Sequence, residues 1–161
     1  MVIWLIGKSG SGKTFYAKKI LSKIRRKKIH IDGDEIREKF FNDKLGFDLK
    51  SRRRNAEFIV NLCKYLEFKG HLVVCSILSI FPDIQKKNRK SFDNYFQIYL
   101  KTSTKILKIN NSKKVYSNKK NIVGIDINFP KPYKSDLVIH NKFDKKYKIQ
   151  LKKIFSKLKY F

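Results

Sequence analysis

The residues with the clearest chemical potential lie at positions 7–14, Gly-Lys-Ser-Gly-Ser-Gly-Lys-Thr. The spacing G-x-x-x-x-G-K-T is the P-loop pattern, whose glycines let successive backbone N–H groups point at a phosphate. In this pattern Lys13 reaches the β- and γ-phosphates of a nucleoside triphosphate, and the Thr14 hydroxyl faces Mg²⁺. An apolar run precedes the motif and a helical pattern follows it, as a P-loop requires. The predicted triphosphate-binding residues are Gly7, Ser9, Gly10, Ser11, Gly12, Lys13 and Thr14.

A second group of polar residues follows the short apolar run 29–31, where Asp32 and Asp34 flank a glycine. The more apolar run 72–78 carries no acidic residue and contains Cys75-Ser76 instead. In a parallel α/β sheet the carboxyl ends of the strands face the ligand, so Asp32 is expected beside the phosphate loop. There it can help to hold the metal or accept a proton from an attacking hydroxyl. The alternative for Asp34 is that it only caps the next helix.

Basic side chains recur at helical spacing beyond these carboxylates. Arg37 lies three residues after Asp34, and Arg52 and Asn55 repeat that spacing at the start of a long helical pattern. Singly, each of these residues is most often a surface group. Together, two arginines and an amide facing one cleft would bind an anionic acceptor, because guanidinium forks match phosphate or sulfate oxygens.

The elements that must position these residues alternate between strands and helices. Strands are expected over 2–6, 29–31, 72–78, 95–100 and 137–139, and helices over 14–25, 35–41, 51–69, from Pro82, 102–109 and 144–160. This alternation predicts an α/β fold, a P-loop NTPase-type three-layer sandwich with a mainly parallel sheet flanked by helices, in a single domain over 1–161. For the basic, amphipathic tail we favour a closing helix packed on the sheet over a membrane-surface helix.

The composition fits a folded globule, with 42% hydrophobic residues among 161. No run approaches the ~18 apolar residues of a membrane span, and Lys8 interrupts the opening apolar run as no signal peptide would. Cys63 and Cys75 lie in apolar segments, so we expect buried, reduced thiols in a cytoplasmic protein. The net charge is +26, but the lysines are scattered. A nucleic-acid-binding P-loop NTPase therefore remains only as an alternative, and no specific nucleic-acid partner is expected.

Taken together, the motifs resemble those of the adenylyl-sulfate kinase family. The matching stretches are 7–14, Asp-Gly-Asp-Glu-Ile-Arg at 32–37, Leu-Gly-Phe at 45–47, Arg52 with Asn55, Ser79, Lys113-Lys114-Val115-Tyr116, and Gly124-Ile125-Asp126 with Phe129 and Pro132. The resemblance implies an enzyme that uses ATP and Mg²⁺ to phosphorylate the ribose 3'-hydroxyl of adenosine 5'-phosphosulfate, giving 3'-phosphoadenosine 5'-phosphosulfate in sulfate activation. It also implies a homodimer.

The resemblance assigns a role to each matching residue. Lys13 and Asp32 would be catalytic, and Thr14 and Asp32 would lie at the metal. A lid over about 110–125 would close over ATP with Lys113 near its phosphates and exclude water from the reaction. The implied acceptor-binding residues are Asp34, Arg37, Phe47, Arg52, Asn55, Ser79 and Phe129.

The chain departs from the family pattern where the acceptor and the lid are recognised. Where the family has Ile-Arg-Arg after the asparagine, this chain has Ala-Glu-Phe at 56–58. Where the family has Ile-Ser-Pro, this chain has Leu-Ser-Ile at 78–80. Where the family has Arg-Asp-Pro before the lid lysine, this chain has Asn-Asn-Ser at 110–112. The Asn88-Arg89 pair and the short lid 116–124 resemble a branch, associated with bacterial capsule synthesis, that phosphorylates cytidine diphosphoramidate. That acceptor is the alternative, with the same fold, the same Asp32 and the same 3'-phosphorylation.

Overall fold

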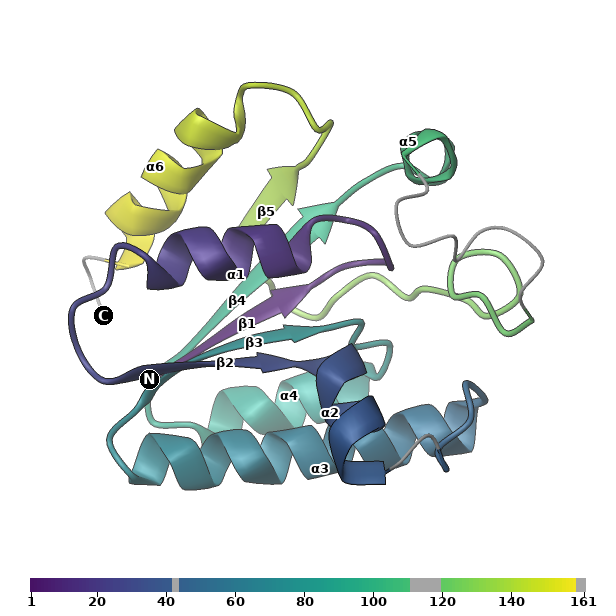
Figure 1. Cartoon of the computed structure of the whole chain (residues 1–161), viewed down its shortest axis with the longest axis horizontal. Coiled ribbons are helices and arrows are strands. Elements are labelled where there is room, and N and C mark those ends of the chain that lie inside the picture. The colour runs from purple at the N-terminus through teal and green to yellow at the C-terminus, as the bar shows by residue number, and fades with distance from the viewer. Residues whose placement is uncertain (42–43, 111–119, 159–161) are drawn as a thin grey trace.

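The computed structural model describes residues 1–41, 44–110 and 120–158, and these contain a five-stranded parallel sheet (Figure 1). The strand order is β2-β3-β1-β4-β5, with β1 at the centre. The strands are β1 Val2–Ile6, β2 Lys28–Asp32, β3 Leu72–Ile77, β4 Tyr95–Lys101 and β5 Leu137–His140. The helices are α1 Lys13–Leu21, α2 Gly33–Phe41, α3 Leu49–Phe68, α4 Pro82–Ser91, α5 Thr104–Ile109 and α6 Tyr147–Leu158. The α/β class and the parallel sheet predicted from the sequence are confirmed.

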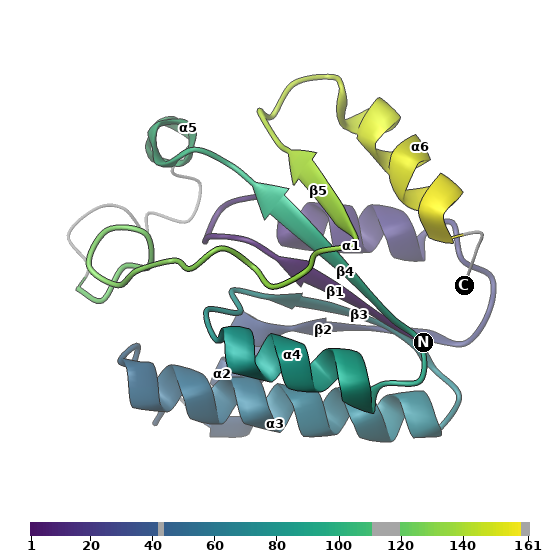
Figure 2. The same ribbon diagram turned by 180° about the vertical axis from the view of Figure 1, so that it is seen from behind.

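Two apolar cores lie on opposite faces of the sheet, and β1 supplies both. Val2, Trp4 and Ile6 pack toward α3 and α4, whereas Ile3 and Leu5 pack toward α1 and α6. This alternation follows from the two-residue period of a strand whose residues are all buried. Figures 1 and 2 show the resulting three layers, with α1 and α6 on one side and α3 and α4 on the other.

Helix α1 is shorter than predicted. It ends at Leu21, and the chain then tightens, since the N–H groups of Lys23 and Ile24 donate to carbonyls three residues back. Ile24 still packs against the core below α1. The apolar period therefore continues past the end of the helix, which is why the sequence predicted a helix to residue 25.

The long helix α3 is defined by its two caps. Asp48 accepts hydrogen bonds from the Ser51 N–H and hydroxyl, at 2.9 and 2.7 Å, so the helix begins two residues before the predicted start. At the other end Gly70, at a φ of +79°, donates to Glu67, and His71 donates to Leu66. These two bonds form a Schellman motif, so the predicted glycine cap is confirmed.

Helix α6 packs on the protein rather than standing apart from it. Ile154 is fully buried against α1, and Tyr147, Leu151 and Leu158 lie around it. The preferred prediction for the tail, a closing helix, is confirmed, although the helix begins at Tyr147 instead of residue 144. No helix within the described residues is long and apolar enough to cross a membrane.

We predict that Ile154→Ala lowers the free energy of unfolding by about 2–4 kcal/mol, because it leaves a cavity between α6 and α1. Urea unfolding followed by circular dichroism measures this change. Ile149→Ala, on an exposed position of the same helix, is the control and should cost less than about 0.5 kcal/mol. Equal effects of the two substitutions would contradict the packing of α6.

Candidate active site

The P-loop joins the centre of the sheet to α1. Gly12, at a φ of +92°, stands at the N-terminus of α1, in a conformation that side chains disfavour. A Cβ on Gly7 would lie 2.8 Å from the Leu100 carbonyl oxygen, so this position admits no side chain. The Lys13 ammonium donates to the carbonyls of Gly7 and Lys8, each at 2.9 Å, and so lies over the loop. The N-terminus of α1 adds its dipole to this concave surface, which suits an anion.

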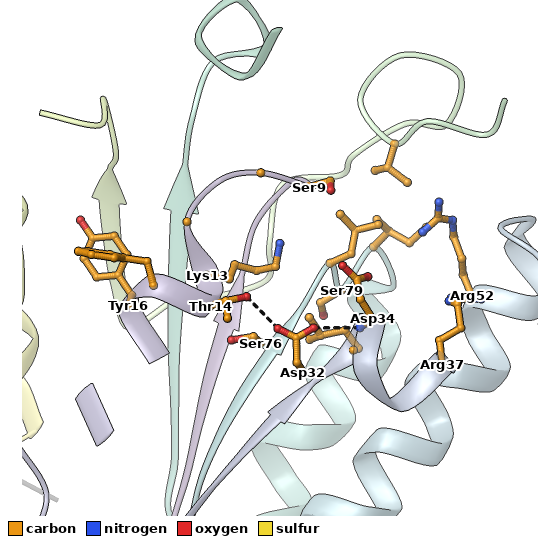
Figure 3. A pocket seen from close by; sticks show the side chains of 18 of the residues that line it. Ser9, Lys13, Thr14, Tyr16, Asp32, Asp34, Arg37, Arg52, Ser76 and Ser79 are labelled. Carbon is orange, nitrogen blue, oxygen red and sulfur yellow. Dashed lines mark hydrogen bonds between the residues drawn. The ribbon is translucent and has the colours of Figure 1, made fainter. Parts of the chain in front are cut away.

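Asp32 lies at the end of β2, beside the first turn of α1. Its Oδ2 accepts a hydrogen bond from the Thr14 hydroxyl at 2.8 Å, and its Oδ1 accepts one from the Asp34 N–H at 3.0 Å (Figure 3). The first bond joins the phosphate loop to the acidic turn, as expected from the parallel sheet. Through the second bond Asp32 supports the first turn of α2, which begins at Gly33.

The Thr14–Asp32 pair is also the place in the site that suits a magnesium ion. A hydroxyl and a carboxylate are the hard oxygen donors that Mg²⁺ prefers, and Mg²⁺ on nucleotides commonly takes its remaining ligands from phosphate and water. Within the residues that the structure describes, no group of three or more His, Cys, Asp or Glu could enclose a metal. The donor set therefore fits a metal carried by nucleotide phosphates, with Thr14 and Asp32 beside it.

A buried hydroxyl lies next to Asp32, on the neighbouring strand. Ser76, the β3 residue paired with Asp32 in the sheet, has its Oγ 2.9 Å from His30 Nε2. Burial lowers the pKa of His30, although Asp32 and Glu35 oppose that shift. The imidazole of His30 is therefore neutral near pH 7 and adds no positive charge near the Asp32 carboxylate.

Arg37 and Arg52 both lie against the ring of Phe47, and all three residues line the cavity described below. Their guanidinium carbons lie 4.9 and 5.5 Å from the centre of the Phe47 ring, within cation–π distance. Arg37 donates to the carbonyls of Leu45 and Gly46. Arg52 donates to the carbonyl of Phe47 at 2.7 Å and to that of Asn121 at 3.0 Å. Burial lowers the pKa of Arg52 and the neighbouring Arg37 lowers it further, so the pair is electrostatically suited to an anion.

Asn55 and Ser79 line the same space from α3 and from the loop after β3. Asn55 is 4% exposed, and its Nδ2 donates to the Gly33 carbonyl at 3.1 Å. Its Oδ1 is buried without a hydrogen-bond partner in the described part of the chain. The side chain of Asn55 therefore ties α3 to the first residue of α2, beneath the surface of the cavity.

One cavity of about 1080 Å³ brings most of the predicted site residues together. The predicted residues that line it are Ser9, Gly10, Gly12, Lys13, Thr14, Asp32, Asp34, Arg37, Phe47, Arg52, Asn55 and Ser79. Gly7 and Ser11 are buried inside the phosphate loop. Phe129 does not line the cavity and instead stacks on Tyr99, with ring centres 5.9 Å apart. Lys113 lies outside the described residues, as does most of the predicted lid.

The wall on the other side of the phosphate loop was not predicted from the sequence. Asn141, just after β5, donates to the Ser11 carbonyl at 3.0 Å and accepts from the Phe143 N–H. Phe15, Phe143 and Tyr147 extend this wall with aromatic surface. The order β1-β4-β5 brings this segment to the phosphate loop from about 130 residues away, and a single sequence does not show that neighbourhood.

The Asn88-Arg89 pair, noted for its resemblance to the capsule-associated branch, lies away from the cavity. Asn88 is fully buried on α4. Arg89 forms an ion pair with Asp136 at 2.9 Å and donates to the Lys134 carbonyl. Arg89 therefore holds the segment before β5, and neither residue of the pair lines the cavity.

Comparisons with known proteins agree with this geometry. The family model described as adenylylsulphate kinase matches residues 1–140. A cytidine diphosphoramidate kinase from Campylobacter jejuni is 36% identical over 148 residues, covering 87% of this chain and 85% of its own length. A probable adenylyl-sulfate kinase from Pyrococcus abyssi is 33% identical over 101 residues, covering 61% of this chain and 58% of its own.

A solved structure is similar over nearly the whole chain. The adenylyl-sulfate kinase of Mycobacterium tuberculosis, in complex with AMPPNP and adenosine phosphosulfate, superposes with a TM-score of 0.85 at 25% identity, covering 98% of this chain and 96% of its own. These relatives are kinases, and the phosphate loop, the acidic turn and the arginine pair lie in one cavity here. The chain belongs to the adenylylsulphate kinase family of ATP-dependent phosphotransferases.

Proposed function

We propose that the protein transfers the γ-phosphoryl group of ATP to the ribose 3'-hydroxyl of a nucleotide, and that this nucleotide is cytidine diphosphoramidate. The convergence of the phosphate loop, Asp32 and the Arg37–Arg52 pair on one cavity supports the reaction. Phosphate binding at one end and a cationic pair at the other suit a donor and an anionic acceptor held together.

In the proposed reaction the acceptor 3'-oxygen bonds to the γ-phosphorus while the bond from that phosphorus to the β–γ bridging oxygen breaks. ADP leaves, and Asp32 takes the proton of the hydroxyl. Lys13 and the backbone of the phosphate loop bind the β- and γ-phosphates. Thr14 and Asp32 would hold the Mg²⁺ that accompanies the nucleotide, and that ion would supply positive charge against the charge that develops on the phosphates. Arg37 and Arg52 hold the anionic part of the acceptor, with its base near Phe47.

One observation favours cytidine diphosphoramidate over adenosine 5'-phosphosulfate, the acceptor that the family resemblance first suggested. The relative named for it matches more of this chain, at higher identity, than the probable adenylyl-sulfate kinase of Pyrococcus abyssi does.

The alternative function, a nucleic-acid-binding P-loop NTPase, loses support because the adenylylsulphate kinase family model matches residues 1–140. We infer further that the protein works in the cytoplasm as a homodimer. Light scattering on the purified protein measures its mass in solution, and a monomer would contradict the dimer.

The acceptor is identified by offering purified protein with MgATP either cytidine diphosphoramidate or adenosine 5'-phosphosulfate. We expect ADP release and a new 3'-phosphate resonance by ³¹P NMR with the cytidine compound, and slower turnover with the adenosine compound. EDTA should abolish turnover, because the donor phosphates then lose their metal. Turnover with the adenosine compound alone would contradict the proposed acceptor but keep the reaction class.

We predict that Asp32→Asn lowers kcat by about 10²–10⁴-fold, because the amide keeps the shape of the carboxylate but cannot take the hydroxyl proton. Single-turnover assays with saturating MgATP measure the chemical step. Asp83→Asn, at an exposed carboxylate that pairs with Arg53, is the control and should leave kcat within twofold. Ordinary turnover by folded Asp32→Asn protein would refute the assigned role.

We also predict that Arg52→Lys lowers kcat/KM for the acceptor by roughly 10–100-fold, because lysine cannot form the planar, paired contacts of a guanidinium. KM for ATP should change by less than about threefold. Arg54→Lys, at an exposed arginine of the same helix that lies over the Phe41 ring outside the cavity, is the matched control and should leave both constants nearly unchanged. Similar losses in both variants would argue against a specific anion contact at Arg52.

A further inference from the structure

Ser79, on the acceptor side of the cavity, has a strained backbone (Figure 3). Its φ is +53°, in the left-handed region that L-residues other than glycine, asparagine and aspartate rarely adopt. The residue is 7% exposed, and its neighbours Ile80 and Phe81 line the cavity with it. A strained conformation of this kind persists only where surrounding contacts fix it.

Two side chains make those contacts with Ser79. The indole Nε1 of Trp4 donates to the Ser79 hydroxyl at 3.4 Å, a long hydrogen bond. The Nε2 of Gln85 donates to the Ser79 carbonyl at 2.8 Å, a short and buried one. By length, the amide of Gln85 is the stronger constraint on the Ser79 backbone.

The side chain of Gln85 is itself fixed in one orientation. It is fully buried on the first turns of α4, where its own N–H donates to the Phe81 carbonyl at 3.2 Å. Its Oε1 accepts from the Tyr133 N–H at 2.7 Å, so both ends of the side-chain amide have partners. A buried amide satisfied at both ends has one defined orientation, because a flip would place two like groups face to face.

A second buried glutamine binds the other backbone polar group of Tyr133, its carbonyl. Gln97, on β4, donates from Nε2 to the Tyr133 carbonyl at 2.8 Å. The Tyr95 hydroxyl donates to Gln97 Oε1 at 2.8 Å. A continuous hydrogen-bond network thus runs from Ser79 through Gln85 and Tyr133 to the sheet, and within the described residues Gln85 is the member of this network that bonds to the cavity wall.

We propose that Gln85 is a positioning residue for the acceptor nucleotide, a role that rests on the kinase reaction proposed above. It does not line the cavity. Through its bond to the Ser79 carbonyl it fixes residues 78–81 in the conformation that contacts the acceptor. The phosphate loop and the aromatic wall beside it lie outside this network. Loss of the bond therefore weakens acceptor binding and leaves ATP binding unchanged.

The test compares Gln85→Met with Gln97→Met, two substitutions of similar volume at fully buried glutamines that contact Tyr133. Both variants are expected to melt at a lower temperature than the wild type. Gln85→Met should raise KM for the acceptor about five- to tenfold while KM for ATP stays within twofold. Gln97→Met should leave both constants within twofold. A merely structural role for Gln85 predicts the same kinetic constants for both variants, and that outcome would overturn the proposal.

An acceptor-free measurement separates this proposal from the proposed reaction. Hydrogen exchange of the amides of residues 78–81, without nucleotide, should be faster in Gln85→Met than in the wild type or Gln97→Met. If the wild type phosphorylates neither nucleotide, the proposed reaction fails while the exchange comparison still tests the positioning role. If Gln85→Met does not fold, Gln85→Glu keeps an acceptor for Tyr133 but faces the Ser79 carbonyl with an oxygen, and the same rise in acceptor KM is expected. Unchanged exchange and unchanged acceptor KM would refute the role.

Discussion

The hydrogen bond between Thr14 and Asp32 is the constraint on which the arrangement of the site depends. It joins the first turn of α1, the helix that follows β1, to the end of β2, although β3 lies between β1 and β2 in the sheet. Leu5 and Asp32 both pair with Ser76, so they stand at the same level of the sheet. The phosphate loop must therefore turn back over β3 to bring Thr14 to the carboxylate. The left-handed glycines of the loop allow that turn.

The opposite side of the cavity depends on buried polar groups rather than on ions. Ser79 is held by Trp4 and Gln85, and Asn55 is held by the Gly33 carbonyl. Such bonds are strong in a protein interior and costly to leave unmade, so each fixes one conformation of the wall. A rigid wall lowers the entropy lost when a second nucleotide is ordered beside the first.

The sequence predicted what is local or periodic. The strands, the P-loop, the cap at Gly70 and the place of Asp32 follow from spacing and from the rule for parallel sheets. The predicted end of α1 was wrong because Ile24, which lies outside the helix, continues the apolar period of the helix. Phe129 shows a different limit, since an aromatic side chain suits a core stack as well as a nucleobase. Gln85 and Asn141 were not predicted because their partners are fixed only by the fold.

The excess of positive charge in the sequence affects how the arginines on the acceptor side of the cavity are held. The chain has 39 Lys and Arg against 13 Asp and Glu, so few carboxylates are available to pair with the arginines of the cavity. Arg37 and Arg52 bond to backbone carbonyls instead. A carbonyl satisfies a guanidinium N–H without cancelling its charge, whereas an aspartate would satisfy and neutralise it. The carbonyls thus orient the two side chains and leave their charges in place, while the negative charges of Asp34 and Asp48 act on both arginines and reduce the positive field that an incoming anion meets.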